Sequence, residues 1–468
     1  MNRAAEMKLN VKPVFPQLVH SGAYEGPCRV GDEKTLSPDT EKAQSKRRFN
    51  EFYEDLRGNL ISDAEILDPI CLEWGEDWIM PESEFEKLKS DLHEVDLFLV
   101  ASSGLPQYPA VEMAQRYNKP LAMLGQVTSI DVSAYLRARG FEGYAPLDFR
   151  DLNRLISLLR VRKAVRQTKM LVATYGNLIT VGVVSNLYDL QDLKARFGID
   201  YTCIPPEQVF NEMDNIIKSE AEQKKAEEQT ERLIENAQKV HMRREYIHQS
   251  VNFYLAAKSL MEKYRCNAFV MPCFEVCVKR IPADRQVTFC LAHSLLKDEG
   301  FPSACEGDIN VLLAMTLLMY TSKKSAYMGN SYVIDKEENL IALHHDVPGL
   351  KMKGLNKPDL PYEIKNFTVE GWGATIRYDF SHDIGETVTL ARFNPTATKL
   401  FVAKGKIAGG EGFNKVGCIL RANIKVRDVV DFFHKEADFG HHLAMVYGDY
   451  TQEIRELGDL MGFDVIES

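Results

Sequence analysis

Short apolar runs alternate with longer polar, helix-like stretches through the first two thirds of the chain. Residues 95–101 (Val-Asp-Leu-Phe-Leu-Val-Ala) and 178–184 (Leu-Ile-Thr-Val-Gly-Val-Val) are rich in aliphatic and β-branched side chains, as buried parallel strands are. Polar stretches lie between such runs, and residues 207–266 contain neither Gly nor Pro, which favours helix. Strand and helix patterns that alternate in this way predict layered α/β structure.

The pattern changes beyond residue 330. Residues 340–345, 387–392 and 399–404 alternate or carry β-branched side chains, with turn residues between them. This pattern predicts an antiparallel sheet or barrel. The final stretches, residues 426–436 and 450–461, return to a helical pattern.

These patterns predict three domains, since a chain of 468 residues is too long for one core. We expect an N-terminal α/β domain over residues 1–170 and a central α/β domain with the candidate metal carboxylates over residues 171–330. A C-terminal β-rich domain with closing helices would follow over residues 331–468. The predicted fold class is therefore α/β, with two Rossmann-like α/β domains followed by a C-terminal antiparallel β-barrel-like domain.

Composition excludes some classes of function. The net charge of −10 argues against a nucleic-acid partner, which needs a basic face. The first residues lack the apolar core of a signal peptide, and no run is long enough to span a bilayer, so we expect no membrane partner. Nine cysteines without a paired framework suit a reducing compartment. We therefore expect a cytoplasmic protein.

Two carboxylates stand directly before the most apolar segment of the chain. Glu306 and Asp308 precede residues 309–320, which have almost no polar side chains and predict a buried helix. One carboxylate at a helix N-terminus is an ordinary cap. Two carboxylates beside a buried helix indicate an enclosed site, where anionic oxygens are costly unless a cation accompanies them.

Other polar groups interrupt apolar surroundings in the same way. Glu275 follows a predicted strand, His344 and His345 end another, and His441 and His442 begin an apolar run. Such groups from distant parts of the chain can converge on one divalent cation, and a carboxylate-dominated set favours Mn²⁺ or Mg²⁺ over zinc. Capping carboxylates and hydrogen-bonded interior histidines explain the same residues without a metal, so both interpretations stay open from the residues alone.

Four segments resemble the L-fucose isomerase and L-arabinose isomerase superfamily of metal-dependent aldose–ketose isomerases. Residues 304–308 (Ala-Cys-Glu-Gly-Asp) look like the family's Cys-Glu-x-Asp segment, and residues 344–348 (His-His-Asp-Val-Pro) like its His-Cys-Thr-x-Pro segment. Residues 385–392 resemble its Gly-x-Val-Thr-x-x-Arg strand, and residues 442–449 its closing His-x-Ala-x-x-x-Gly-Asp segment. Glu275 matches the place of the family's first metal carboxylate. The resemblance runs from about residue 170 to the end.

The resemblance implies a metal site and a mechanism. Glu275, Asp308 and His442 would hold one Mn²⁺ or another divalent cation, with His344 as a fourth ligand or a substrate contact. Glu275 and Asp308 would be the catalytic acid and base that move a proton between C2 and C1 of an open-chain aldose, through a cis-enediolate. Glu306 would be a cap or a supporting residue.

The resemblance also suggests a substrate and an assembly. The substrate would be a monosaccharide, with deoxy and anionic sugars among the candidates. Arg29 and His441 would contact it, Arg29 from a neighbouring subunit, because family members are homo-oligomers, trimers or hexamers. Trp372, between two glycines, is a core or turn residue or a further substrate contact, because a Trp beside a polar site can pack against a sugar face. His441 replaces the family's usual Asn. A lyase or epimerase on the same fold and a non-catalytic sugar-binding protein are the alternatives, because fold alone does not fix function.

Overall fold

A computed structural model of the protein describes residues 3, 6–27, 29–77, 79–103 and 105–468. The chain divides into two compact units, residues 8–160 and residues 161–468, the latter together with the N-terminal residues up to Met7. The central sheet and the C-terminal barrel described below share the second unit. The three-domain division of the sequence stays a prediction.

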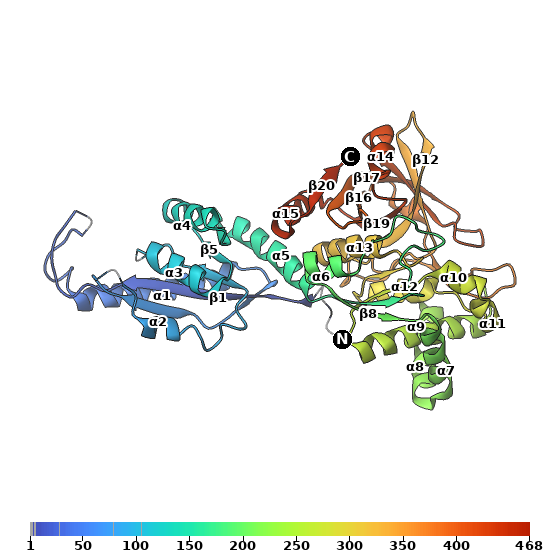
Figure 1. Cartoon of the computed structure of the whole chain (residues 1–468), viewed down its shortest axis with the longest axis horizontal. Helices are drawn as coiled ribbons and strands as arrows, with labels where there is room; N and C mark the ends of the chain where they lie inside the picture. The colour runs from blue at the N-terminus through green and yellow to red at the C-terminus, as the bar shows by residue number, and fades with distance from the viewer. Residues whose placement is uncertain (1–2, 4–5, 28, 78, 104) are drawn as a thin grey trace. The chain divides into compact units, whose positions relative to one another are not determined.

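The N-terminal unit is a parallel sheet with helices between its strands (Figure 1). The strand order is β2-β1-β4-β5-β6, and β3 also pairs with β1. Strand β4 is buried at every position, which explains its continuous apolar sequence. The strands are β1 Leu9–Leu18, β2 Ala64–Ile66, β3 Ile70–Trp74, β4 Leu97–Val100, β5 Leu121–Met123 and β6 Gly143–Tyr144. The helices are α1 Pro38–Asn59, α2 Glu82–Glu86, α3 Gln107–Tyr117 and α4 Val127–Ala138, and the boundary between the two units falls within α5 Phe149–Arg166.

A second parallel sheet opens the larger unit. Its strand order is β11-β10-β7-β8. Strand β8 therefore pairs with one edge of β7, and β10 pairs with the opposite edge. The strands are β7 Lys169–Ala173, β8 Asp200–Ile204, β10 Ala268–Val270 and β11 Ser303–Ala304. The accompanying helices are α6 Gln191–Phe197, α7 Glu207–Lys218, α8 Glu220–Asn236, α9 Arg244–Tyr264, α10 Cys273–Val278, α11 Ile281–Arg285 and α12 Cys290–Asp298.

Helix α13 (Ile309–Ser322) is buried on every face from Ile309 to Tyr320. It contacts β10 and β11 of the central sheet as well as two barrel strands, β16 and β19. A helix packed on both sides by protein has no polar face, which is the pattern that the sequence shows. The predicted buried helix is therefore confirmed.

The C-terminal part forms a closed antiparallel barrel. Its order is β16-β19-β12-β13-β18-β17, and β17 pairs back to β16, which closes the six strands into a ring. Strand β20 extends β17 in parallel. These strands are β12 Tyr327–Asp335, β13 Leu340–His344, β16 Thr387–Phe393, β17 Lys399–Glu411, β18 Arg421–Val426, β19 His442–Tyr447 and β20 Asp464–Glu467. A small sheet joins β9 Lys239–Val240, β14 Glu363–Asn366 and β15 Ala374–Arg377, and the remaining helices are the 3₁₀ turn Phe380–Asp383, α14 Val429–Glu436 and α15 Thr451–Met461.

Two parallel α/β sheets followed by an antiparallel barrel confirm the predicted fold class. One predicted strand is wrong, however. Residues 178–184 form an irregular loop after β7, and the side chains of Val181 and Val184 are 72% and 74% exposed. β-branched residues predict a strand only where a partner strand covers them, and here the Val181 N–H bonds the carboxylate of Glu275 instead. Among the residues that the structure describes, no helix combines the length and apolar character needed to cross a membrane.

Candidate active site

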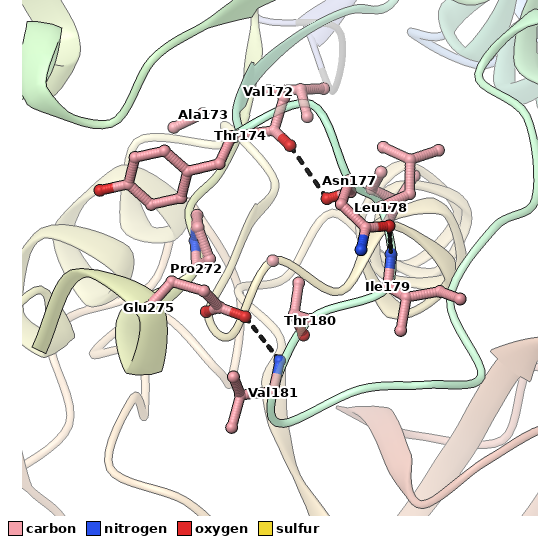
Figure 2. A pocket seen from close by; sticks show the side chains of 13 residues that line it. Val172, Ala173, Thr174, Asn177, Leu178, Ile179, Thr180, Val181, Pro272 and Glu275 are labelled. Carbon is pink, nitrogen blue, oxygen red and sulfur yellow. Dashed lines mark hydrogen bonds between the residues drawn. The ribbon is translucent and has the colours of Figure 1, made fainter. Parts of the chain in front are cut away.

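A cavity of about 360 Å³ lies at the carboxyl ends of β7 and β10. The chain order reverses between these two strands, and open α/β sheets bind ligands at such a switch point. The volume falls in the range of small-molecule sites. Its lining includes Thr174, Asn177, Thr180, Val181, Glu275 and Gly307 (Figure 2).

Glu275, on the short helix α10 after β10, presents its carboxylate to this cavity. Its Oε1 accepts a hydrogen bond from the Val181 backbone N–H at 2.5 Å, which is drawn in Figure 2. Its Oε2 is buried and has no hydrogen-bond partner among the described residues. The loop therefore holds one oxygen of Glu275 and leaves the other available for chemistry.

A buried group of Glu306, His345 and His442 could hold a metal ion, because their ligand atoms lie within 4.8 Å of one another. Glu306 Oε1 is 3.2 Å from His345 Nε2, and Glu306 Oε2 is 3.5 Å from His442 Nε2. Burial opposes ionisation of Glu306, but the hydrogen bond from His345 and the other histidines nearby still lower its pKa. The carboxylate is thus ionised at neutral pH.

Glu306, the carboxylate of this candidate metal group, has a strained backbone conformation. Its φ of 58° is left-handed, a region that costs a non-glycine residue roughly 1–2 kcal/mol. Gly307 follows with φ 71°, and the Thr180 methyl group and Pro272 pack against it. The two residues turn the chain sharply between β11 and α13. Such strain in a buried carboxylate is typical of a functional site.

The loop after β7 also packs against Glu306. A Cβ atom on Gly182 would lie 2.5 Å from Glu306 Oε2 and 2.9 Å from the Phe274 ring, so only glycine fits. The preceding residue, Val181, is the one that bonds Glu275. Val181 and Gly182 therefore connect the cavity carboxylate to the candidate metal group.

Asp308 lies behind this group and is fully buried. Its Oδ1 caps α13 by accepting from the Val311 N–H at 3.0 Å. Its Oδ2 accepts from Arg392 Nη1 at 2.5 Å and lies 3.0 Å from His442 Nδ1. Burial alone would raise the pKa of Asp308, but Arg392 and His442 hold it well below its usual range. Both oxygens are thus engaged. The ligand and acid–base roles of Asp308 stay predictions, and the geometry favours Glu306 as the metal carboxylate.

His344 and His345 face different surroundings, because successive residues at the end of a strand point to opposite sides. The His344 ring packs edge-on against Tyr332, with ring centroids 5.2 Å apart. His345, 1% exposed, reaches Glu306. The proposed ligand role of His344 stays a prediction, while His345 is the histidine that the structure brings into the group.

The other candidate substrate contacts are placed as follows. His441 packs on His442, with ring centroids 4.3 Å apart. Trp372 lies in the turn between β14 and β15 and donates its indole N–H to Glu370. Arg29 belongs to the N-terminal unit, where it donates to the carbonyl oxygens of Gly22 and Leu36. Their substrate roles stay predictions.

Arg392 is the main residue that sequence reasoning missed. Its guanidinium is fully buried in β16 and donates to Asp308, to the carbonyl oxygens of Phe439 and His442, and to Ser185. It joins the barrel, the start of α13 and the loop after β7. The sequence does carry a signal for this residue, because Arg392 lies at the end of the apolar run of residues 387–392. An arginine buried with such a strand needs an anionic partner.

Comparison with known proteins gives a consistent picture. The chain is 26% identical over 327 residues to a protein named sulfoquinovose isomerase from Alkalicoccus urumqiensis, covering 67% of this chain and 68% of that one. Sulfoquinovose isomerases from Priestia aryabhattai and Priestia megaterium are each 24% identical over 330 residues, with 67% of both chains covered. No family model matches the chain. These relatives are sugar isomerases, the class that the sequence predicted.

Proposed function

We propose that this protein is a metal-dependent aldose–ketose isomerase that acts on an anionic monosaccharide. The observation that carries the proposal is the buried group of Glu306, His345 and His442 beside a sugar-sized cavity with a free carboxylate oxygen. Similarity to sulfoquinovose isomerases supports the same activity and an anionic substrate.

The donor set fits a divalent cation. His442 Nε2 is buried without a hydrogen-bond partner among the described residues, which is costly for a polar atom unless something binds it. The ionised carboxylate of Glu306 lies 3.5 Å away. Mixed carboxylate and imidazole ligands suit several divalent ions, and we propose Mn²⁺ as the first to test.

A cation held here would act as a Lewis acid that stabilises negative charge on the sugar oxygens at C1 and C2. The chain supplies the proton transfer. Glu275 lines the cavity and has one oxygen without a hydrogen-bond partner among the described residues, so we assign it the transfer of the proton from C2 of the open-chain sugar to C1. The Val181 N–H holds its other oxygen and fixes the direction of the free one. The next residue in the same loop, Gly182, packs against Glu306.

The substrate class follows from the relatives. Proteins named sulfoquinovose isomerase are similar to this chain over two thirds of its length, and sulfoquinovose is a sulfonated aldose. We therefore propose that sulfoquinovose or another sugar with an acidic group is preferred over neutral aldoses. The cytoplasmic location, the homo-oligomer and the absence of a nucleic-acid partner stay predictions.

A substrate panel tests this proposal. Sulfoquinovose, glucuronate, glucose, L-fucose and L-arabinose are each incubated with the Mn²⁺-loaded protein, and ketose formation is read by NMR. We expect ketose from an acidic aldose at a rate at least about tenfold above the neutral ones. Reaction in deuterated water distinguishes an epimerase, which would return an aldose labelled at C2 and no ketose. No ketose from any sugar would contradict the proposal.

A further inference from the structure

His345 follows β13 and His442 begins β19, the two strands that flank β12, and both histidines approach the same carboxylate. Each points its Nε2 at Glu306, at 3.2 Å and 3.5 Å. A neutral imidazole carries one proton, and the partner of one nitrogen decides whether the other nitrogen is a donor or a lone pair. The partners of the two Nδ1 atoms therefore determine what each histidine offers to Glu306 and to a cation.

For His442, the partner of Nδ1 is a hydrogen-bond acceptor. Its Nδ1 lies 3.0 Å from Asp308 Oδ2, and that oxygen also accepts from Arg392. An ionised carboxylate can only accept, so Nδ1 carries the proton. In the neutral ring, the Nε2 atom of His442 is then the lone pair. It is buried and has no hydrogen-bond partner among the described residues. This carboxylate–histidine arrangement is the one that proteins use behind metal-binding imidazoles.

For His345, the partner of Nδ1 is a hydrogen-bond donor. The backbone N–H of Asp346 lies 3.0 Å from His345 Nδ1, and a backbone N–H can only donate. The Sγ atom of Cys418 lies 3.3 Å from the same nitrogen. Nδ1 of His345 is thus the lone pair, and its Nε2 carries the proton toward Glu306.

We propose that the fold holds the two histidines in opposite tautomers, so that only His442 offers a lone pair to the cation. His345 instead donates its Nε2–H to Glu306 and positions that carboxylate. Asp308 and Arg392 are positioning residues that fix the tautomer of His442. This inference rests on the proposed metal use of the same site, and it divides the three-residue group into two ligands and one hydrogen-bond donor.

The tautomers can be read without any metal. The full chain is labelled with ¹⁵N-histidine, treated with EDTA and studied at pH 8 by long-range ¹H–¹⁵N correlation. His442→Asn and His345→Gln assign the two rings by loss of their signals. We expect protonated Nδ1 for His442 and protonated Nε2 for His345. The same tautomer in both rings would overturn the inference, whether or not the protein binds a cation.

Metal affinity gives a second test with matched variants. His442→Asn keeps an N–H near the position of Nδ1 but removes the Nε2 lone pair, and His345→Gln keeps an N–H near the position of Nε2. Binding of Mn²⁺ is followed by the electron paramagnetic resonance signal of the free ion. We expect the affinity to fall at least about 100-fold for His442→Asn and by no more than about threefold for His345→Gln. Equal losses would overturn the inference. If the unaltered protein binds no Mn²⁺, the proposed function fails, while the tautomer measurement still decides the inference.

Asp308→Asn tests the positioning role. An amide at this place can donate to His442 Nδ1, which would move the proton to Nε2. We expect the His442 signals to shift toward the Nε2–H tautomer and Mn²⁺ affinity to fall about 10- to 100-fold. An unchanged His442 tautomer would show that Asp308 does not set it. Circular dichroism of each variant confirms that it has folded.

Discussion

The buried pair of Arg392 and Asp308 makes a quantitative prediction about stability. Both side chains are inaccessible to solvent, and Nη1 lies 2.5 Å from Oδ2. Removing one member of a buried ion pair leaves the other charge unpaired, which costs about 3–5 kcal/mol. Arg392→Met and Asp308→Asn should therefore each destabilise the larger unit by roughly 4 kcal/mol.

The double variant, with Arg392→Met and Asp308→Asn together, should lower the free energy of unfolding by far less than the sum of the two single losses. With both charges gone, no unpaired charge remains, and the loss consists mainly of the hydrogen bonds from Arg392 to Phe439, His442 and Ser185. These are four hydrogen bonds, two of them to Ser185, and at about 1 kcal/mol each they give roughly 4 kcal/mol for the double variant. The coupling energy between the two sites is then about 3 kcal/mol or more.

Native-state hydrogen exchange read by mass spectrometry measures these energies in the relevant part of the chain. Peptides that cover β16 and β19 report on the unit that contains the pair, and EDTA removes any contribution from bound metal. The exposed pair Lys404 and Asp449, 2.7 Å apart in the same unit, is the matched control and should couple by less than about 1 kcal/mol. A coupling energy below about 1 kcal/mol for Arg392 and Asp308 would refute the reasoning.

Three further predictions concern the site and the barrel. Glu275→Gln should lower kcat about 100-fold or more with little change in Mn²⁺ affinity, since the amide keeps the shape but cannot take a proton; steady-state kinetics and Mn²⁺ titration check this. Gly182→Ala should weaken Mn²⁺ binding about tenfold, because the added Cβ would lie 2.5 Å from Glu306 Oε2; alanine at Gly409, where an added Cβ would meet nothing within 4 Å, is the control. Burial raises the pKa of Glu436 from 4.5 to about 7, so the free energy of unfolding should fall as pH rises between these values. The loss should reach roughly 3 kcal/mol at pH 8, and Glu436→Gln should remove it. Urea unfolding at a series of pH values measures both effects.

The pattern of hydrophobic residues predicted the fold class, because the burial of each helix or strand by its neighbours determines which of its positions are apolar. The run at residues 309–320 has no polar face, and α13 lies between the central sheet and the barrel. The alternating runs beyond residue 330 became barrel strands. The run at residues 178–184 has the same β-branched composition but is a loop, and its Val181 N–H bonds the carboxylate of Glu275, which is distant in the chain. That pairing is set by tertiary structure and leaves no local signal.

The candidate site was predicted in part, for similar reasons. The segments that carry Glu275, Glu306, Asp308 and His442 were singled out from polar residues in apolar surroundings. Which of Glu306 and Asp308 faces the group depends on the left-handed turn at Glu306, and nothing in the residue types predicts that turn at a non-glycine position. Likewise, strand alternation allows only one of two adjacent histidines to face Glu306, and the register that selects His345 comes from the pairing of β13 with its neighbours.

Metal-dependent isomerisation of an acidic sugar is tested most directly with metal-stripped protein. The protein is treated with EDTA, dialysed, and supplied with sulfoquinovose, and ketose is measured by NMR before and after Mn²⁺ is returned. We predict no ketose from the stripped protein and restored formation with Mn²⁺ in the unaltered chain, but not in His442→Asn. Ketose formation at the full rate by the stripped protein would contradict the account.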